Sequence, residues 1–167
     1  ISLAQMMENA GRGLAQLTRR LLTGNVAGKR VVVLSGAGNN GGGGMVAARH
    51  LHNWGAQVEV ALVSSAARLT GVPAQQDHII HKMGLPTTNP RLTGADMIID
   101  AIIGYGLRGA PRSPAADWIT RANDSGVPIL ALDIPSGLDA STGVPCAPCI
   151  RATATLTLAL PKQGLQA

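Results

Sequence analysis

Phenylalanine is absent from this chain of 167 residues, and aromatic residues make up only 2% of it. The core must therefore be built from aliphatic side chains, which dominate the 46% of residues that are hydrophobic. Bases stack on aromatic side chains in many proteins that bind single-stranded nucleic acid, so this scarcity argues against that class. The length suits a single domain with a core of ordinary size.

Charged residues are also scarce, at 14% of the chain, and the formal net charge is +5. The basic residues are dispersed along the sequence and do not form the runs that are typical of nucleic-acid-binding segments. A small phosphorylated ligand explains the sign of the charge equally well. We therefore do not expect nucleic acid as a partner.

Long apolar runs and targeting signals are missing as well. No eighteen consecutive residues are apolar, which excludes a transmembrane helix, and residues 1–4 lack the basic start of a signal peptide. We expect a cytoplasmic protein without a membrane partner.

Cys146 and Cys149 form a CxxC motif, but no second such pair completes a structural zinc site. We expect two free thiols in a loop.

Hydrophobic periodicity predicts helices that alternate with short β-branched strands. Ser2 and Gln5 fit a capping box at the start of a first helix, which runs from Leu3 to about Leu21. The alternation predicts an α/β, Rossmann-like fold of three layers, with a mostly parallel sheet and helices on both faces. The remaining predicted helices are 44–54, 73–83 and 114–123, and the predicted strands are 30–35, 57–63, 97–102, 129–133 and 153–160.

Residues 36–44 read Gly-Ala-Gly-Asn-Asn-Gly-Gly-Gly-Gly and lie between a predicted strand and a predicted helix. A glycine loop at this place lets backbone N–H groups approach a phosphate, and the helix N-terminus adds a partial positive charge. Asn39 and Asn40 add donors and acceptors. The alternative is a tight turn whose glycines only relieve crowding.

Polar residues follow two further strands, and the carboxyl ends of the strands are where open α/β sheets bind ligands. Asp100 closes the third strand, Asp133 closes the fourth, and Ser136 follows Asp133 closely. Either aspartate alone could equally be a turn or capping residue. Together with Asn40 they offer hard oxygen ligands of the kind that hold an alkali or alkaline-earth cation.

Several motifs, in order along nearly the whole chain, resemble the NAD(P)H-hydrate epimerases, the YjeF N-terminal domain family. They are Met6-Met7-Glu8-Asn9-Ala10-Gly11, Gly38-Asn39-Asn40-Gly41-Gly42, Ala47-Ala48-Arg49-His50-Leu51, Asp100-Ala101 with Gly104-Tyr105-Gly106-Leu107-Arg108, Asp133-Ile134-Pro135-Ser136-Gly137-Leu138-Asp139 and Lys162-Gln163-Gly164-Leu165. The resemblance implies an isomerase of metabolite repair. Its substrate would be NADH or NADPH hydrated at C6, whose R and S forms it interconverts for a partner dehydratase. It also leads us to expect a homodimer.

The resemblance further implies roles for individual residues. Nucleotide contacts would come from two loops, Asn39, Asn40, Gly41 and Gly42 in the first and Gly104, Gly106, Leu107 and Arg108 in the second. Asn40, Asp100 and Ser136 would bind a potassium ion. Asp133 would lie beside the hydrated ring and is the residue we expect to transfer the proton, because a carboxylate can both give and take one. Ring opening and reclosure, or a water as proton carrier, are alternatives.

Two departures from the family pattern leave alternatives open. The family loop normally reads Asn-Asn-Gly-Gly-Asp-Gly, but position 43 is Gly43 here. We therefore weigh a catalytically weakened, nucleotide-binding or scaffold module against the enzyme. An NAD-dependent oxidoreductase is a further alternative, but Glu59 lies within its strand and not at the end where a ribose would need it. We expect residues 1–167 to be one family domain shortened at both ends, and a dehydratase domain could be fused to it.

Overall fold

The computed structural model describes residues 1–65, 68–85, 87–160 and 162–165. Within these residues, parallel strands form one sheet in the order β2-β1-β3-β4-β5. The strands are β1 (Arg30–Ser35), β2 (Gln57–Leu62), β3 (Met97–Ala101), β4 (Ile129–Leu132) and β5 (Ala154–Leu156). The strand order reverses direction between β1 and β3, which is the switch point where ligands bind in sheets of this type.

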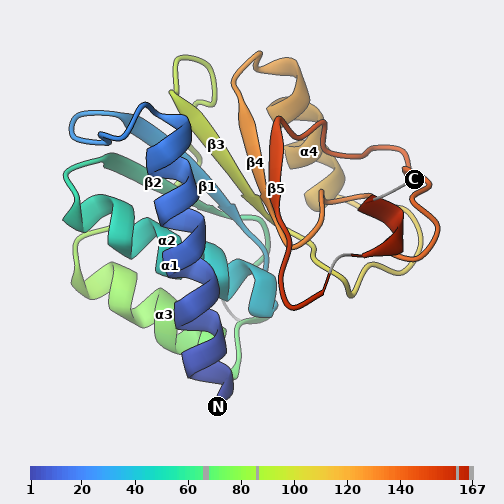
Figure 1. Cartoon of the computed structure of the whole chain (residues 1–167), viewed down its shortest axis with the longest axis horizontal. Coiled ribbons are helices and arrows are strands. Elements are labelled where there is room, and N and C mark those ends of the chain that lie inside the picture. Colours follow the sequence, from blue (N-terminus) through green and yellow to red (C-terminus); the bar gives the residue numbers. More distant parts are fainter. Residues whose placement is uncertain (66–67, 86, 161, 166–167) are drawn as a thin grey trace.

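Helices cover both faces of the sheet. The helices α1 (Leu3–Leu21), α2 (Asn39–Asn53) and α3 (Gly71–Lys82) lie together on one face, and α4 (Ala115–Asp124) lies on the other (Figure 1). A short 3-10 turn, Gln163–Leu165, follows β5. The predicted three-layer, Rossmann-like α/β architecture is confirmed.

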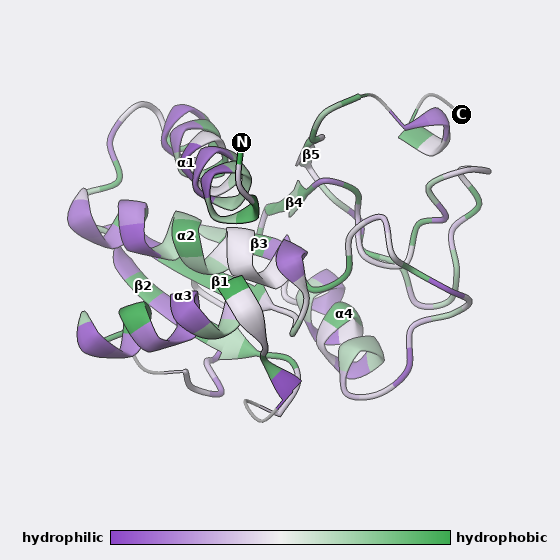
Figure 2. Ribbon diagram, turned by 90° about the horizontal axis from the view of Figure 1, so that it is seen from below, coloured by the Kyte–Doolittle hydropathy of each residue, from purple (hydrophilic) through white to green (hydrophobic). Residues whose placement is uncertain are grey.

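Successive strand residues point to opposite faces and supply two separate aliphatic cores. In β1, Val31 and Val33 pack on the side of α1, α2 and α3, whereas Val32 and Leu34 pack on the side of α4. All four side chains are fully buried. Strands covered on both faces read as continuous hydrophobic runs. In Figure 2 the middle of the sheet is mostly green or white, whereas the helices carry purple segments.

The predicted capping box starts α1. The Ser2 hydroxyl accepts a hydrogen bond from the Gln5 amide at 3.2 Å, and the Gln5 side chain accepts one from the Ser2 amide at 2.8 Å. Two otherwise unpaired N–H groups are satisfied in this way. The N-terminal turns of α1 are thereby fixed in a position that matters for the site described below.

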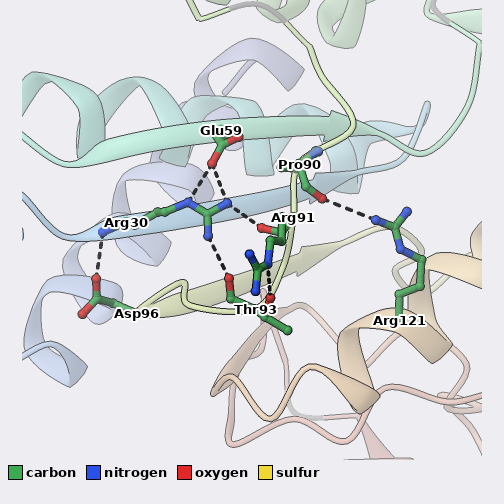
Figure 3. Close-up of polar contacts among 7 residues, drawn as sticks. All are labelled: Arg30, Glu59, Pro90, Arg91, Thr93, Asp96 and Arg121. Atoms are coloured by element: carbon green, nitrogen blue, oxygen red, sulfur yellow. Dashed lines mark hydrogen bonds and ion pairs between the residues drawn. The ribbon is translucent and has the colours of Figure 1, made fainter.

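A polar network ties the β1–β2 edge of the sheet to the segment before β3 (Figure 3). Arg30, the first residue of β1, forms an ion pair of 2.7 Å with Glu59 of β2. The Arg30 amide donates to Asp96 at 2.8 Å, and Arg121 of α4 donates to the Pro90 carbonyl at 3.4 Å. These arginines serve the fold, at a distance from the carboxyl ends of the strands.

Most predicted element boundaries lie within a few residues of those observed, and two differ substantially. The fifth strand ends at Leu156 and not at residue 160, because its partner β4 offers only Leu130–Leu132 for pairing. The second predicted helix begins five residues earlier than expected, at Asn39, with consequences for the site. None of the helices in the described part of the chain combines the length and the hydrophobicity needed to span a bilayer.

Candidate active site

A cavity of about 620 Å³ lies at the carboxyl ends of β1, β3 and β4, as expected for this fold. Its size is in the usual range for small-molecule sites. The wall opposite the sheet comes from the N-terminal half of α1, which the capping box holds in place. The lining residues are Leu3, Met6, Met7, Ala10, Gly38, Asn39, Asn40, Gly43, Ile102, Ile103, Gly104, Tyr105, Gly106, Leu132, Asp133 and Leu158.

The glycine segment is mostly helix and not loop, which corrects the prediction that the helix starts at residue 44. Gly38 is the N-cap of α2, and Gly41 to Gly44 form its first turns. A Cβ on Gly41 would lie 1.9 Å from the backbone oxygen of Gly36, and one on Gly42 would lie 2.5 Å from Met7 Sδ. Gly41 and Gly42 are absent from the described residues that line the cavity. The structure explains these two glycines by close packing of α2 on its neighbours.

The N-terminus of α2 faces the cavity with two asparagines. Gly38, Asn39 and Asn40 line it, so the free N–H groups and the partial positive charge of the helix end are available to an anion. The Asn40 side-chain nitrogen is buried and is one of few such atoms in the described residues without a hydrogen-bond partner. The oxygen and nitrogen of an amide are assigned from their surroundings. In the flipped orientation the unpaired group would be a carbonyl oxygen, a suitable cation ligand.

Gly43, the position at which the resemblance implies an aspartate, lines the cavity from the second turn of α2. It has no positive φ angle, so a left-handed backbone is not the reason for glycine here. A Cβ would lie 2.8 Å from Leu132 Cδ2, the end of a side chain in the cavity wall. An aspartate at this position would therefore require Leu132 to shift.

Asp100 and Ser136 form a buried pair behind the cavity wall. The Ser136 hydroxyl donates to Asp100 Oδ1 at 2.6 Å, and the Ser136 amide donates to Asp100 Oδ2 at 2.8 Å. The Ile102 amide donates to Oδ1 at 3.2 Å. Burial raises the pKa of Asp100 to about 6, although these hydrogen bonds favour the ionised form.

The chemistry of Asp100, Ser136 and Asn40 fits a monovalent cation. No ion pair among the described residues reaches Asp100, so nothing balances its charge when it is ionised. A buried carboxylate without a counter-charge is costly. The described residues contain no cluster of three or more His, Cys, Asp or Glu side chains that could hold a metal. One carboxylate with neutral oxygens suits an alkali ion better than a transition metal.

Asp133 is nearly buried, at 7% exposure, and lines the cavity directly after β4. Its φ angle of 69° lies in the left-handed region, which few residues other than glycine adopt. Its Oδ2 accepts a hydrogen bond from the Tyr105 amide at 3.1 Å, and its Oδ1 accepts one from the Leu158 amide at 3.4 Å. A carboxylate that is fixed in a sparsely populated backbone conformation in the wall of a cavity is typical of a functional residue.

The second predicted loop reaches the cavity only in part. Gly104 and Gly106 line it, and a Cβ on Gly104 would lie 3.0 Å from Asn40 Cγ, so the two loops are in contact. Leu107 and Arg108 are not among the described lining residues, and Arg108 is exposed.

The two cysteines, Cys146 and Cys149, are free, and burial raises the pKa of the Cys149 thiol, which disfavours the reactive thiolate.

Sequence reasoning missed three groups of site residues. Tyr105, a residue that is 66% exposed, lines the cavity, and its backbone amide donates a hydrogen bond to Asp133. Lys162 forms an ion pair of 2.6 Å with Asp133. Lys162 belongs to one of the motifs that resemble the family, but nothing in the sequence indicates what its side chain does. The α1 side chains Leu3, Met6 and Met7 follow helical spacing, which indicates burial without showing what they cover.

Comparisons with known proteins agree with this geometry. A family model described as YjeF-related protein N-terminus matches residues 3–164. A protein named NAD(P)H-hydrate epimerase from Dehalogenimonas lykanthroporepellens is 44% identical, over 98% of this chain and 68% of its own length. A protein named bifunctional NAD(P)H-hydrate repair enzyme Nnr from Moorella thermoacetica is 40% identical over 96% of this chain. The chain spans only 32% of that bifunctional relative.

A solved structure shares the fold over the same extent. The crystal structure of the yeast protein ynu0 (YNL200c) superposes with a TM-score of 0.87 at 29% sequence identity. The match covers 99% of this chain and 74% of the yeast chain. The family predicted from the order of the motifs is confirmed.

Proposed function

The chain belongs to the family of YjeF-related N-terminal domains, and from this premise we propose that it interconverts the R and S epimers of C6-hydrated NADH and NADPH. Relatives named as NAD(P)H-hydrate epimerases match nearly the whole chain, which supports an isomerase. The observation that carries the proposal is Asp133, a fixed carboxylate in the wall of a cavity at the switch point of the sheet.

The chemistry of epimerisation suits a single carboxylate. C6 of the hydrated ring carries a hydroxyl group next to the ring nitrogen N1. When that hydroxyl is protonated, the nitrogen lone pair forms a double bond to C6 and water leaves. Addition of water to the other face of the resulting iminium ion inverts the centre. Asp133 is the group we assign to proton transfer, a role that typically contributes about 10²–10⁴-fold to the rate.

Several of the other predicted residues would hold the nucleotide. Asn39, Asn40 and the N-terminus of α2 offer N–H groups to a phosphate. Gly104 and Gly106 let the second loop approach the same ligand closely, and the exposed Arg108 beyond it would supply a positive charge. A dehydratase that consumes the S epimer is the functional partner we propose, and the relatives named as bifunctional NAD(P)H-hydrate repair enzymes support this pairing of activities.

We also propose that Asn40, Asp100 and Ser136 hold a potassium ion. The ion would supply a positive charge beside the nucleotide site. The support is the uncompensated Asp100 carboxylate and the unpaired Asn40 amide, both described above. Without the ion, Ser136 still holds the Asp100 carboxylate in place through the hydrogen bonds that its amide and hydroxyl donate.

Wild-type protein should accelerate repair of the R epimer. A hydrate preparation enriched in the R form is mixed with a dehydratase that is specific for the S form, with and without this protein. We expect the absorbance of reduced cofactor to return faster in its presence than by spontaneous epimerisation. Equal rates in the two samples would exclude the enzyme and favour the nucleotide-binding module, an alternative consistent with Gly43.

A potassium site should make stability depend on potassium above pH 6. Asp100 holds its proton more tightly in the folded state, with a pKa of about 6 against 3.8. Without a cation, the free energy of unfolding therefore falls as pH rises from 3.8 to about 6, by on the order of 3 kcal/mol. A cation bound to the ionised carboxylate offsets this loss.

We expect potassium chloride to raise Tm at pH 8, relative to tetramethylammonium chloride of the same ionic strength. Each kcal/mol of cation binding should raise Tm by roughly 2–4 °C. At pH 5 the carboxyl group is protonated and the two salts should give nearly the same Tm. The same Tm in both salts at pH 8 would contradict the potassium site.

A further inference from the structure

Lys162 forms the most buried ion pair of the described residues. Its Nζ lies 2.6 Å from Asp133 Oδ1, and the two side chains are 14% and 11% exposed. In the other ion pairs, at least one partner is 38% exposed or more. Lys162 also donates a hydrogen bond to the Leu158 carbonyl, which fixes its ammonium group.

Asp133 stands between this lysine and the cavity. Asp133 and Leu158 line the cavity, whereas Lys162 is not among the described lining residues. Lys162 is therefore placed to act on a bound ring only through Asp133. It comes from the segment after β5, and Asp133 comes from the end of β4, so the pair also joins the two last strands.

The ion pair with Lys162 bears on where Asp133 obtains the proton that a leaving hydroxyl needs. Both oxygens of Asp133 accept from N–H groups, those of Tyr105, Leu158 and Lys162, and an oxygen that only accepts has no proton to give to a leaving hydroxyl. The ammonium group of Lys162 carries three N–H donors and can give one up. At 2.6 Å it is in direct hydrogen-bond contact with the carboxylate.

We propose that Lys162 is the proton store for Asp133, a positioning residue that acts through the carboxylate; this rests on the epimerase function proposed above. A proton passes from Lys162 Nζ to the Asp133 carboxylate and from there to the C6 hydroxyl. The C6–O bond breaks, its electron pair leaves with water, and the N1 lone pair forms the N1=C6 bond.

The charges balance at each step. The pair changes from neutral to a net charge of −1 while the ring becomes a cation of charge +1, so the negative charge develops where the iminium ion needs it. Water then adds to the other face of C6, the double-bond electrons return to N1, and the proton that this water loses returns to the carboxylate and the amine. The pair ends in its starting state.

Three variants separate proton storage from simple support of Asp133. Lys162→Met removes both the charge and the proton. Lys162→Arg keeps a positive charge but cannot be deprotonated in a protein. Lys162→Ala leaves space that added propylammonium ion can enter. Lys29→Met is the matched control, because Lys29 is paired at 3.0 Å with Asp96, on the segment that precedes β3 and away from the cavity lining.

We expect Lys162→Met and Lys162→Arg to lower kcat by about 100-fold or more, with KM within about threefold of wild type. Propylammonium should restore rate to Lys162→Ala, and tetramethylammonium, which has no N–H, should not. Lys29→Met should have wild-type kcat. Tm of each variant shows that it is folded at the assay temperature.

The outcomes are distinguishable. A Lys162→Arg variant with kcat within about threefold of wild type would overturn the proposal, because charge alone would then suffice. Rescue of Lys162→Ala by tetramethylammonium would overturn it equally, and so would full activity of Lys162→Met. Wild-type protein without epimerase activity is a separate result, which would overturn the proposed function and this inference with it.

Discussion

Asparagine in place of Asp133 should lower the epimerase kcat by about two to four orders of magnitude. Asp133 carries the one carboxylate among the described residues that line the cavity, and an amide cannot take up and release a proton as a carboxylate does. The measurement is the repair of R-enriched hydrate coupled to an S-specific dehydratase. Retention of more than about a tenth of the wild-type kcat would show that another group transfers the proton.

Asparagine is a better test than alanine because of the backbone at position 133. The φ angle of 69° is tolerated by aspartate and asparagine and is strained for alanine. Asp139→Asn is the matched control, since it makes the same change six residues later and outside the cavity lining. The Asp139 Oδ1 accepts from Ser141 and Thr142, and an asparagine oxygen can do the same. We expect this control to keep wild-type kcat and Tm.

Alanine in place of Gly41 should destabilise the fold severely. Its Cβ would lie 1.9 Å from the backbone oxygen of Gly36 and 2.7 Å from the Gly36 carbonyl carbon, and backbone atoms cannot move aside as a flexible side chain can. We expect a loss of about 3 kcal/mol or more. Thermal unfolding should show a fall in Tm of roughly 6–12 °C or greater.

Gly38→Ala is the matched control in the same segment. Gly38 has a φ of −88° and open space where the methyl group of alanine would lie, so its alanine variant should lose less than about 1 kcal/mol. Gly38 lines the cavity, however, so the same variant should weaken nucleotide binding, measured by titration calorimetry. A stable Gly41→Ala variant that binds poorly would reverse the assignment and make Gly41 a ligand contact.

The sequence predicted the central strands β1, β3 and β4 well because they are buried on both faces. Runs such as Val31-Val32-Val33-Leu34 and Met97-Ile98-Ile99 have few alternatives to a central parallel strand. Since parallel strands end at a common edge, the prediction that Asp100, Asp133 and Asn40 converge also followed. What the sequence did not reveal was the strand order, which depends on crossovers between distant segments.

The start of α2 was mispredicted because glycine disfavours helix by intrinsic propensity. Tertiary packing decides here: Gly41 to Gly44 lie so close to Gly36, Met7, Leu132 and Ala101 that larger residues would clash. The role of Lys162 was hidden for another reason. Its contact with Asp133 spans 29 residues of sequence and depends on where the chain turns after β5, which no local pattern records.

Each of the two cores on opposite faces of the sheet has its own tryptophan, so fluorescence can follow the two cores separately. The chain has two tryptophans. Trp54, beneath the guanidinium of Arg19 at 5.1 Å, packs against the core on the side of α1, α2 and α3. Trp118, with Arg121 3.9 Å above its ring, belongs to the core on the side of α4. Variants that retain one indole each would therefore report separately, by fluorescence, on the unfolding of each layer.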